Sequence, residues 1–575
     1  MANQNAEVVD LLQAIGDLME LRGDEAFKVR AYREAARQMD RVTEDVASLA
    51  AEDRLTEVRG IGPSIARTIR EYLETGESTQ LSALREEVPE SLVELLGIRH
   101  FGPSRIVKVH RALGVSSLDE LEAAARDGRL AAVPGFGAKT VETLLTSIAR
   151  FRRRRGHVAR YVAESMTGSL VHALRQMADL SLVEPVGGMR RLCDSVREIE
   201  LLAATESPEE AIEAFERLTP IREIERVSGF EALGRTRERY AVRLHVVPPA
   251  LWEQGLVWFS SSEDHQAQLL TLAAERGNGA PEAGREHWPG FLRLDLRPKD
   301  EASIYAQLGL PLIPPELREG QGEIEAALAG KLPRLLELGD LRGDLHIHTT
   351  WSDGRHTVRQ MAEKAQSIGH AYVAIADHSP SLGVARGLTV ERLAQQRAEI
   401  AEADADLKGI SILSGVEVDI RHDGSLDYPE EVMAAFDFVT ASIHSGFQQP
   451  SEQLTERVIA ALRSPHVDCI GHLTGRVLGW REGLDLDVER ILQVAAETGT
   501  AMEINAWPNR LDLNEEHARR AVELGVKLVI NTDAHAADQM DYLHYGVEIA
   551  RRAWVTKQDV LNTRTRQSLL EARKG

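Results

Sequence analysis

The sequence has few cysteines and no long apolar run, and each absence narrows the class of protein. Two cysteines, Cys193 and Cys469, cannot build a disulfide framework, which is typical of proteins kept in a reducing cytoplasm. No apolar stretch reaches the roughly 18 residues that a bilayer span requires. Residues 1–12 show no basic segment followed by an apolar one, so no secretory signal is expected. These features predict a cytoplasmic protein with no membrane partner.

Acidic residues are in excess over the chain as a whole, but unevenly. The 575 residues exceed a single core and predict about three to five domains. They carry 68 Lys and Arg against 90 Asp and Glu, a net charge of -22. Residues 97–160 reverse this balance, with 13 basic against 5 acidic residues and four arginines at 152–155. Such a segment can hold a nucleic-acid backbone, although a solvated charged face is the alternative.

Three glycine turns punctuate the otherwise helical pattern of residues 1–156. Each precedes a predicted helix, so backbone N–H groups and the positive helix end can grip a phosphate without reading a base. This is the helix-hairpin-helix mode of DNA binding, although a single glycine turn also ends ordinary helices. The predicted DNA contacts are Gly60, Gly62, Gly102, Arg105, Gly135, Gly137 and Lys139.

From residue 343 onward, apolar runs alternate regularly with helical stretches. Seven such runs are found, and helices are predicted between them, for example over 389–405 and 514–525. Repeated strand–helix units imply a parallel sheet, and ligand-type residues at the strand ends imply a barrel with its site at the C-terminal face. A doubly wound open sheet is the structural alternative.

Histidines and carboxylates follow these apolar runs in a dense series. Side chains two residues apart on a strand share a face and can bind one ion together. Imidazoles mixed with carboxylates suit Zn²⁺, Mn²⁺ or Fe²⁺ better than Mg²⁺ or Ca²⁺. The series is too long for one ion and predicts two or three, a centre suited to phosphoester hydrolysis by activated water. The predicted ligands and catalytic residues are His346, His348, Asp353, His378, Glu417, His444, His472, Asp533 and His535.

These motifs resemble those of bacterial family X DNA polymerases with a C-terminal PHP (polymerase and histidinol phosphatase) domain. The glycine turns, residues 187–191, 313–319 and 322–325, and the ligand series carry the resemblance, which spans essentially the whole chain. It implies a multidomain fold: an all-α helix-hairpin-helix N-terminal domain, an α+β nucleotidyltransferase-like palm with a thumb, and a distorted (β/α)7 PHP barrel. The expected divisions are 1–85 DNA-end-binding, 86–156 fingers-like, 157–247 palm-like, 248–325 thumb-like, 326–342 linker and 343–575 PHP.

The resemblance also distributes the ligands among ions. It implies a first ion on His346, His348, Glu417 and Asp533. Glu417 would bridge to a second on His444 and His472, and Asp353, His378 and His535 would hold a third. Asp377 is expected to orient His378. Further histidines outside the pattern are expected at the surface or in loops: His356, His370, His422 and His466.

The palm departs from the family pattern at the residues that carry polymerase chemistry. In the family, three aspartates hold two Mg²⁺ ions for nucleotidyl transfer. Glutamate displaces a metal that demands near-ideal octahedral distances, and arginine brings a fixed positive charge. Mg²⁺ at the palm is therefore not expected, and the palm is predicted to be a scaffold or a DNA clamp. The corresponding residues of this degenerate site are Gly188, Arg191, Glu198, Glu200 and Arg243.

The combined prediction is a DNA-repair nuclease of family X type. The family implies 3′→5′ exonuclease action, with apurinic-site endonuclease and 3′-phosphatase activities, on gapped, nicked or 3′-ended DNA, by a nucleoid-associated monomer. Lyase activity is not expected, because residues 62–69 contain no lysine to form a Schiff base. The alternatives are a gap-filling polymerase with a glutamate-based metal site, a small-molecule phosphatase, and a non-catalytic DNA-end-binding factor.

Overall fold

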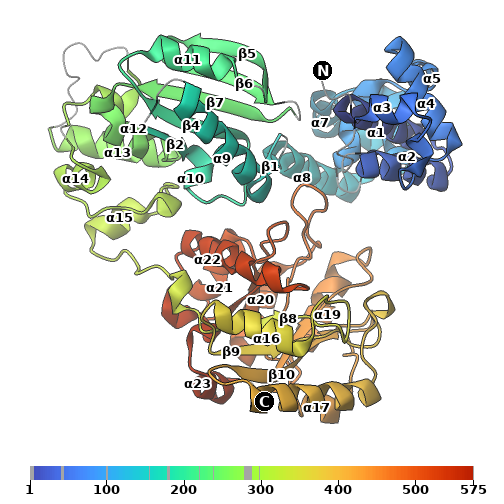
Figure 1. Cartoon of the computed structure of the whole chain (residues 1–575), viewed down its shortest axis with the longest axis vertical. Helices are drawn as coiled ribbons and strands as arrows, with labels where there is room; N and C mark the ends of the chain where they lie inside the picture. Colours follow the sequence, from blue (N-terminus) through green and yellow to red (C-terminus); the bar gives the residue numbers. More distant parts are fainter. Residues whose placement is uncertain are drawn as a thin grey trace. The chain divides into compact units, whose positions relative to one another are not determined.

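The computed structural model divides into two compact units, Met1–Arg155 and Gly156–Gly575 (Figure 1). It describes residues 5–39, 45–98, 101–154, 156–177, 180, 182–218, 220–236, 239–277, 288–296 and 298–573. Arg99, His100 and Arg155 of the predicted basic segment lie outside these residues. Within the described ranges, no helix is both long and apolar enough to cross a bilayer. The finer domain boundaries stay a prediction.

The first unit consists of helices around one apolar core, as the sequence predicts. Pro63 and Pro103 occupy first-turn positions of two helices, where a missing N–H breaks no helical hydrogen bond. Gly62 and Gly102 cap these two helices. The α-helices are α1 (Asn5–Arg22), α2 (Ala26–Met39), α3 (Val46–Ala51), α4 (Pro63–Thr75), α5 (Thr79–Glu87), α6 (Pro103–Leu113), α7 (Leu118–Arg126) and α8 (Ala138–Arg154).

The second unit begins with a mixed five-stranded sheet in the order β2-β4-β7-β6-β5. β4 and β7 are parallel and the other pairs antiparallel, an arrangement that places the degenerate polymerase residues of both strands side by side. The strands are β2 (Leu182–Val186), β4 (Glu198–Ala204), β5 (Ile221–Ser228), β6 (Glu231–Thr236) and β7 (Ala241–Val247), with a small pair β1 (Val158–Ala159) and β3 (Ser195–Val196). Helices α9 (Arg160–Met177), α10 (Gly187–Arg190) and α11 (Pro208–Glu216) accompany them.

A small helical segment follows the sheet and has its own apolar core. Its centre is polar as well: His265 is fully buried and contacts Glu323 at 2.5 Å and the Tyr305 hydroxyl at 3.1 Å. These hydrogen bonds satisfy groups that burial would otherwise destabilise. The helices are α12 (Trp252–Phe259), α13 (Glu263–Glu275), α14 (Glu301–Gln307) and α15 (Glu323–Leu328).

Seven parallel strands then form a nearly closed barrel in the order β14-β13-β12-β11-β10-β9-β8. β8 and β14 meet across the remaining gap, where Leu345 N–H donates to Asn531 Oδ1 at 2.9 Å and His348 N–H donates to the Ala534 carbonyl at 2.8 Å. The closed form excludes the open-sheet alternative. The strands are β8 (Gly343–Ile347), β9 (Tyr372–Ile375), β10 (Ser411–Asp419), β11 (Phe438–Ser442), β12 (Cys469–Ile470), β13 (Ala501–Asn505) and β14 (Leu528–Asn531).

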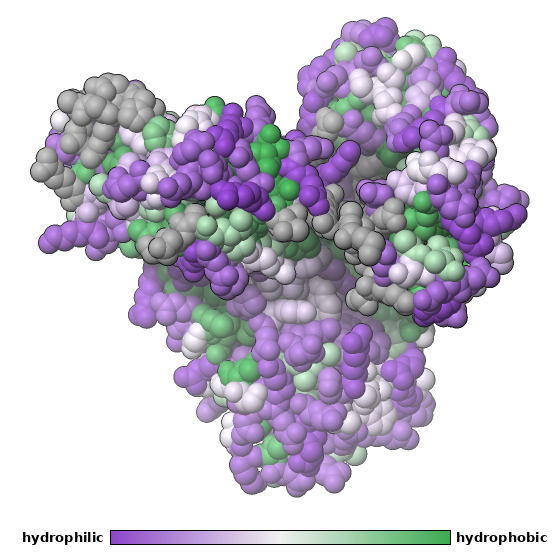
Figure 2. All heavy atoms as spheres, turned by 45° about the horizontal axis from the view of Figure 1, so that its top comes forward, coloured by the Kyte–Doolittle hydropathy of each residue, from purple (hydrophilic) through white to green (hydrophobic). Residues whose placement is uncertain are grey.

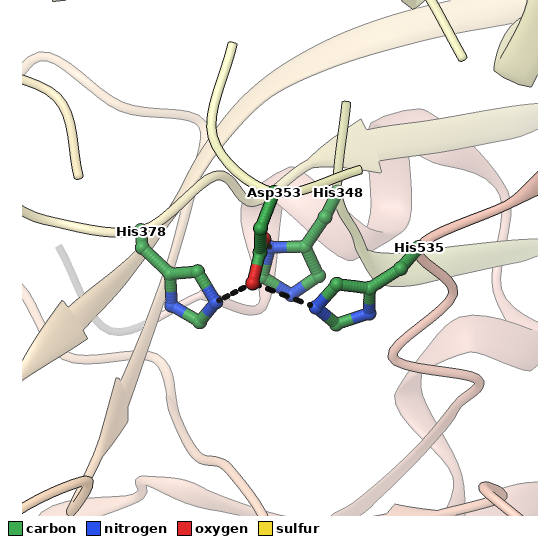
Figure 3. Close-up of side chains that lie close together, drawn as sticks. All are labelled: His348, Asp353, His378 and His535. Atoms are coloured by element: carbon green, nitrogen blue, oxygen red, sulfur yellow. Dashed lines mark ion pairs between the residues drawn. The ribbon is translucent and has the colours of Figure 1, made fainter. Parts of the chain in front are cut away.

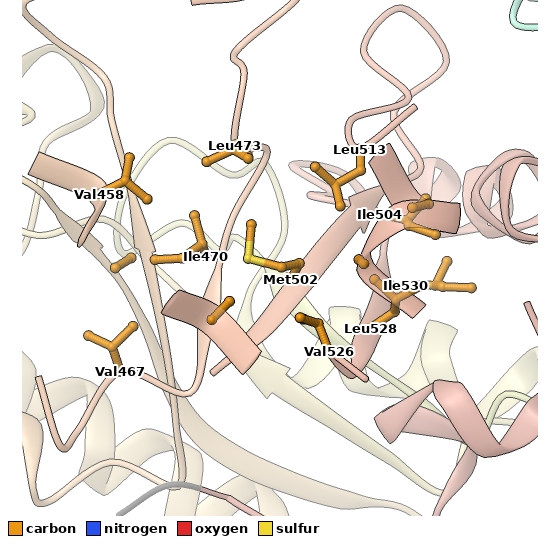
Figure 4. Close-up of a cluster of buried hydrophobic side chains, with 14 of the residues drawn as sticks. Val458, Val467, Ile470, Leu473, Met502, Ile504, Leu513, Val526, Leu528 and Ile530 are labelled. Carbon is orange, nitrogen blue, oxygen red and sulfur yellow. The ribbon is translucent and has the colours of Figure 1, made fainter. Parts of the chain in front are cut away.

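Helices cover the barrel and bury its apolar strands. Alternating strand residues such as Ile470, Met502 and Ile530 gather in the core drawn in Figure 4. The visible face of the molecule is mostly hydrophilic, with hydrophobic side chains in small groups (Figure 2). The helices are α16 (Val358–Ser367), α17 (Val390–Asp406), α18 (Glu430–Met433), α19 (Ser451–Leu462), α20 (Val488–Thr498), α21 (Glu515–Glu523), α22 (Leu543–Arg552) and α23 (Arg566–Glu571).

Buried arginines join the barrel to the five-stranded sheet within the second unit. Arg476 Nη1 lies 2.8 Å from Asp194 Oδ2. Arg552 donates to the Arg191 carbonyl at 2.7 Å and to Glu319 at 2.9 Å. Truncating Arg476 would remove the ion-pair partner of Asp194, which is destabilising, whereas Glu319 also pairs with Arg191 at 3.0 Å.

Candidate metal centre

The predicted ligands lie at the carboxyl ends of six barrel strands, where the sequence pattern places them. His346 belongs to β8 and Glu417 to β10, while the others follow β8, β9, β11, β12 and β14. His472 and Asp533 adopt left-handed backbone conformations, with φ of 26° and 56°. A non-glycine residue in this conformation is strained, and strained residues of this kind are found mostly at functional sites. The barrel closure therefore holds both side chains in a disfavoured geometry.

One group of donors surrounds Asp353 (Figure 3). Three imidazoles from different segments point toward its carboxylate. Asp353 Oδ2 lies 3.5 Å from His378 Nε2 and 3.4 Å from His535 Nε2, and Oδ1 lies 3.9 Å from His348 Nδ1. These donor atoms lie within 4.8 Å of one another, a separation that suits a shared cation.

A second group of donors surrounds the fully buried Glu417. Its Oε1 lies 2.9 Å from His472 Nε2 and 3.3 Å from His444 Nε2. Its Oε2 lies 2.7 Å from His378 Nδ1 and 3.5 Å from His346 Nε2. His348 Nε2 lies 3.8 Å from the same Oε2, so one carboxylate faces five imidazoles and stands in the position of a bridging ligand.

Asp533 completes the constellation. Its Oδ1 lies 3.0 Å from His348 Nε2 and 3.7 Å from His346 Nε2. The donor atoms form three overlapping groups, in which His348 and His378 each belong to two. In the grouping expected from the family, Glu417 alone bridges. The structure brings all nine predicted residues together, while their distribution among individual ions stays a prediction.

The donor set fits a divalent cation. Among the described residues, His346 Nε2, His348 Nδ1 and Glu417 Oε2 are buried without a hydrogen-bond partner. Atoms of neighbouring predicted ligands lie within 4 Å of each, but not in hydrogen-bonding geometry. Buried polar atoms without partners are costly. A metal ion that accepts their lone pairs removes this cost.

Charge within the cluster holds the donors in mixed protonation states. Burial and the neighbouring His535 and His378 lower the pKa of His348 to about 3, so this imidazole is neutral. Burial opposes ionisation of Glu417, yet His444, His346 and His378 hold its pKa well below the usual value. An ionised carboxylate and a neutral imidazole are the forms that bind metal.

Two carboxylates that the sequence reasoning missed support the ligands from behind. Glu503 lies 2.8 Å from His346 Nδ1 and accepts the His472 N–H at 2.7 Å. Asp419 lies 2.6 Å from His444 Nδ1. Each fixes an imidazole tautomer and ring orientation. Two features of the sequence could have indicated these residues. Glu503 is a charged residue inside the apolar run 500–506, and Asp419 is a carboxylate two residues after Glu417.

Asp377 differs from its expected role. It accepts hydrogen bonds from Thr349 N–H at 2.8 Å, from Gln396 at 2.6 Å and from the Ser352 hydroxyl. Within the described residues no hydrogen bond joins it to His378, so it fixes the loop after β8 rather than the imidazole. Of the histidines left outside the pattern, His370 lies in a loop but is buried.

We expect Asp419→Asn to reduce metal-dependent hydrolysis by about 10- to 100-fold, the usual cost of losing a carboxylate behind a ligating histidine. The amide oxygen carries no negative charge, so it is a weaker acceptor for the His444 Nδ1–H than the carboxylate. Rates on an oligonucleotide and metal content by mass spectrometry measure the effect. Asp423→Asn is the matched control, because Asp423 is exposed and, among the described residues, its carboxylate accepts hydrogen bonds from Ser425 alone. Wild-type rate and metal content in Asp419→Asn would contradict the assignment.

Metal binding should release protons near neutral pH. Although burial opposes protonation, Glu417 and other carboxylates raise the pKa of His378 to about 10 and that of His444 to about 9. Both imidazoles are therefore protonated in the metal-free protein and must lose a proton to bind. Metal affinity should rise as pH increases toward these values. Titration calorimetry in buffers of different ionisation enthalpy tests this, and heats independent of the buffer at pH 7 would refute it.

The glycine turns of the first unit lie at helix starts. Gly60 and Gly135 have φ of 85° and 94°, a region that favours glycine. The Arg105 guanidinium lies 5.9 Å from the centre of the Phe136 ring, so the second and third turns are neighbours. Lys139 is exposed in the first turn of α8.

Part of the predicted basic segment is already paired within the protein. Arg152 binds Glu122 at 2.8 Å and also contacts Asp119. Its charge is thereby partly neutralised. The phosphate contacts expected at the glycine turns stay a prediction.

The five-stranded sheet pairs the charges of the degenerate polymerase site. Arg243 donates to both carboxylate oxygens of Glu198 at 3.0 Å and also contacts Glu231. Glu200 lies 3.5 Å from His245. Arg191, in the preceding turn, donates to Glu319 at 3.0 Å. The guanidinium supplies the positive charge that a metal would bring to a carboxylate site. Gly188 lies in α10.

Four family models match the chain. They describe a helix-hairpin-helix domain over residues 3–78, a SAM-like helix-hairpin-helix tandem over 92–150, a DNA polymerase beta thumb over 255–319 and a PHP domain over 344–506. The fold and the donor set thus define a multidomain protein with a metal-dependent PHP hydrolase barrel. This confirms the predicted fold class.

The chain is 37% identical to the DNA polymerase/3′-5′ exonuclease PolX of Bacillus subtilis (strain 168), over 97% of both chains. The chain belongs to the PolX family, and the predicted family is confirmed. Its barrel alone is 30% identical to a protein named Probable phosphatase in Thermoanaerobacter sp. (strain X514), over 38% of this chain and 89% of that one. A Probable phosphatase of Acetivibrio thermocellus is 34% identical over 33% of this chain.

Proposed function

We propose that this protein hydrolyses DNA phosphodiesters at the barrel and acts as a 3′→5′ exonuclease in DNA repair. The observation that carries the proposal is the convergence of nine ligand-type side chains, Glu417 among them, with buried lone pairs left unpartnered among the described residues. The name of the Bacillus subtilis relative supports the activity. Apurinic-site endonuclease and 3′-phosphatase activities belong to the same chemistry, and the phosphatase names of the barrel relatives support the latter.

Two or three Zn²⁺, Mn²⁺ or Fe²⁺ ions are proposed as the cofactors, since imidazole and carboxylate donors suit these metals. The nine predicted ligands would hold them. When bound, such ions activate water and neutralise charge on the phosphate. No Ser or Cys nucleophile is needed.

The protein's own residues prepare the centre for that chemistry. Glu503 and Asp419 hold the Nδ1 protons of His346 and His444, so that both Nε2 atoms face the Glu417 side of the centre. Arg510 Nε lies 4.0 Å from Asp533 Oδ2, and its side chain is a quarter exposed. A guanidinium at this edge is placed to bind a substrate phosphate.

We propose that the five-stranded sheet and the thumb-like segment serve as a DNA clamp and do not polymerise. The bidentate pair between Arg243 and Glu198 supports this role, because it places a fixed cation where Mg²⁺ would bind. The first unit would hold a gap, nick or 3′ end through its glycine turns. We also propose that the chain divides into domains as the sequence predicts, and that the protein is a monomer located at the nucleoid.

A gapped duplex with a 5′ label on the strand bordering the gap tests the function. Metal-reconstituted protein is expected to shorten the labelled strand, whether or not nucleotides are present. Lengthening with nucleotides would establish the alternative, a gap-filling polymerase. Release of phosphate from small phosphomonoesters with no change in the DNA would establish a small-molecule phosphatase instead.

A further inference from the structure

A tight hairpin presents an exposed tryptophan on the barrel. Arg481 N–H donates to the Val477 carbonyl at 2.8 Å, and Gly479 supplies the φ of 75° at the tip. Trp480, next in the turn, is 80% exposed. Tryptophan is enriched at interfaces, where its large ring packs against a partner.

A cavity of about 440 Å³ lies between this hairpin and the start of the five-stranded sheet domain, within the second unit. Its volume falls in the range of small-ligand sites. Aromatic rings line it from both sides, which provides flat faces for a planar ligand. The principal lining residues are His157, Tyr161, Tyr240, Leu478, Trp480 and Asn509.

Two arginines directly follow lining residues of the cavity: Arg481 follows Trp480, and Arg510 follows Asn509. Arg481 packs over the Phe447 ring at 4.8 Å and donates to the Gly475 carbonyl at 3.0 Å. Burial and the nearby positive charge of Arg510 lower its pKa. Within the described ranges, no carboxylate forms an ion pair with Arg481. Two neighbouring guanidiniums favour an anion between them, and phosphate is the anion whose geometry they match.

The cavity and the metal centre share one segment of chain. Leu478 N–H donates to the Asn509 carbonyl at 2.6 Å, which ties the hairpin to this segment. The next residue, Arg510, lies 4.0 Å from the Asp533 carboxylate of the centre. Adjacent residues of one segment thus line the cavity and contact the metal centre.

We propose that this cavity binds a nucleobase of single-stranded DNA, stacked on Trp480, with the adjoining phosphate held by Arg481 and the strand passing Arg510 into the metal centre. The inference rests on the proposed hydrolysis of DNA. Aromatic faces combined with arginines are the features that grip single strands without sequence preference. The site would set the path of the strand to the centre.

The test uses the full-length protein and a short labelled oligothymidylate. Trp480→Ala is expected to raise the KM for hydrolysis by about tenfold and to weaken binding of the strand in chelator by a similar factor, the usual effect of losing one base stack. Trp480→Phe should restore most of the loss, because it retains a ring. Leu338→Ala, which removes another exposed apolar side chain remote from the cavity lining, should leave both values unchanged.

A scan of abasic positions locates the stacked base. In the wild type, removing one particular base should raise KM, and in Trp480→Ala the same removal should have little further effect. Additive losses, or wild-type binding and KM in Trp480→Ala, would overturn the inference. If the reconstituted wild type fails to cut DNA but binding still depends on Trp480, the proposed hydrolysis falls and the binding site stands.

Discussion

Joint replacement of His346 and His348 by alanine is expected to reduce DNA hydrolysis to the background of the assay. Both imidazoles are fully buried and face Asp533, and they are two of the three imidazoles within 4 Å of that carboxylate. Losing them removes several kcal/mol of charge stabilisation, which corresponds to about a thousandfold or more in rate. Single-turnover hydrolysis of a 5′-labelled strand, with metal analysis of the same sample, measures the loss.

The matched control variant alters the carboxylates of the five-stranded sheet instead of the ligands of the barrel. Glu198→Ala with Glu200→Ala should change hydrolysis little, because these carboxylates pair with Arg243 and His245 and lie on a different sheet from the donors of the barrel. Circular dichroism checks that both double variants fold. Loss of hydrolysis in the glutamate variant, with full activity in the histidine variant, would reverse the roles assigned to the two centres.

Removing the metal should abolish hydrolysis and lower the stability of the second unit. Without ions, the centre keeps unpartnered buried atoms on His346, His348 and Glu417. A ligand that binds only the folded state adds about 4 kcal/mol when its concentration is a thousand times Kd. Dialysis against a chelator should therefore lower the unfolding temperature in scanning calorimetry.

Adding metal back to the chelated protein distinguishes the loss of bound ions from irreversible damage to the fold. Mn²⁺ or Zn²⁺ should return both activity and unfolding temperature, whereas the His346→Ala, His348→Ala protein should respond weakly to either metal. A chelated sample that hydrolyses DNA at the full rate and unfolds at the same temperature would show that the donor cluster holds no functional ion.

Local sequence patterns were sufficient to predict the barrel and its ligand series. Each ligand follows a short apolar run, so its position at a strand end depends only on neighbouring residues, as with His444 after β11 and His472 after β12. Glycine turns and helical periodicity are local in the same way. The substitutions at Glu198, Glu200 and Arg243 were also visible, because residue identity alone limits metal binding.

The sequence by itself thus determined the fold class, the family and which residues end at the mouth of the barrel. The tertiary structure decided how those residues are shared. Glu503 contacts His346, which is 157 positions away in the sequence. Asp377 binds the loop after β8 instead of His378, and Arg243 pairs with Glu198. Such contacts depend on ring closure and side-chain direction between distant strands, which no local periodicity encodes.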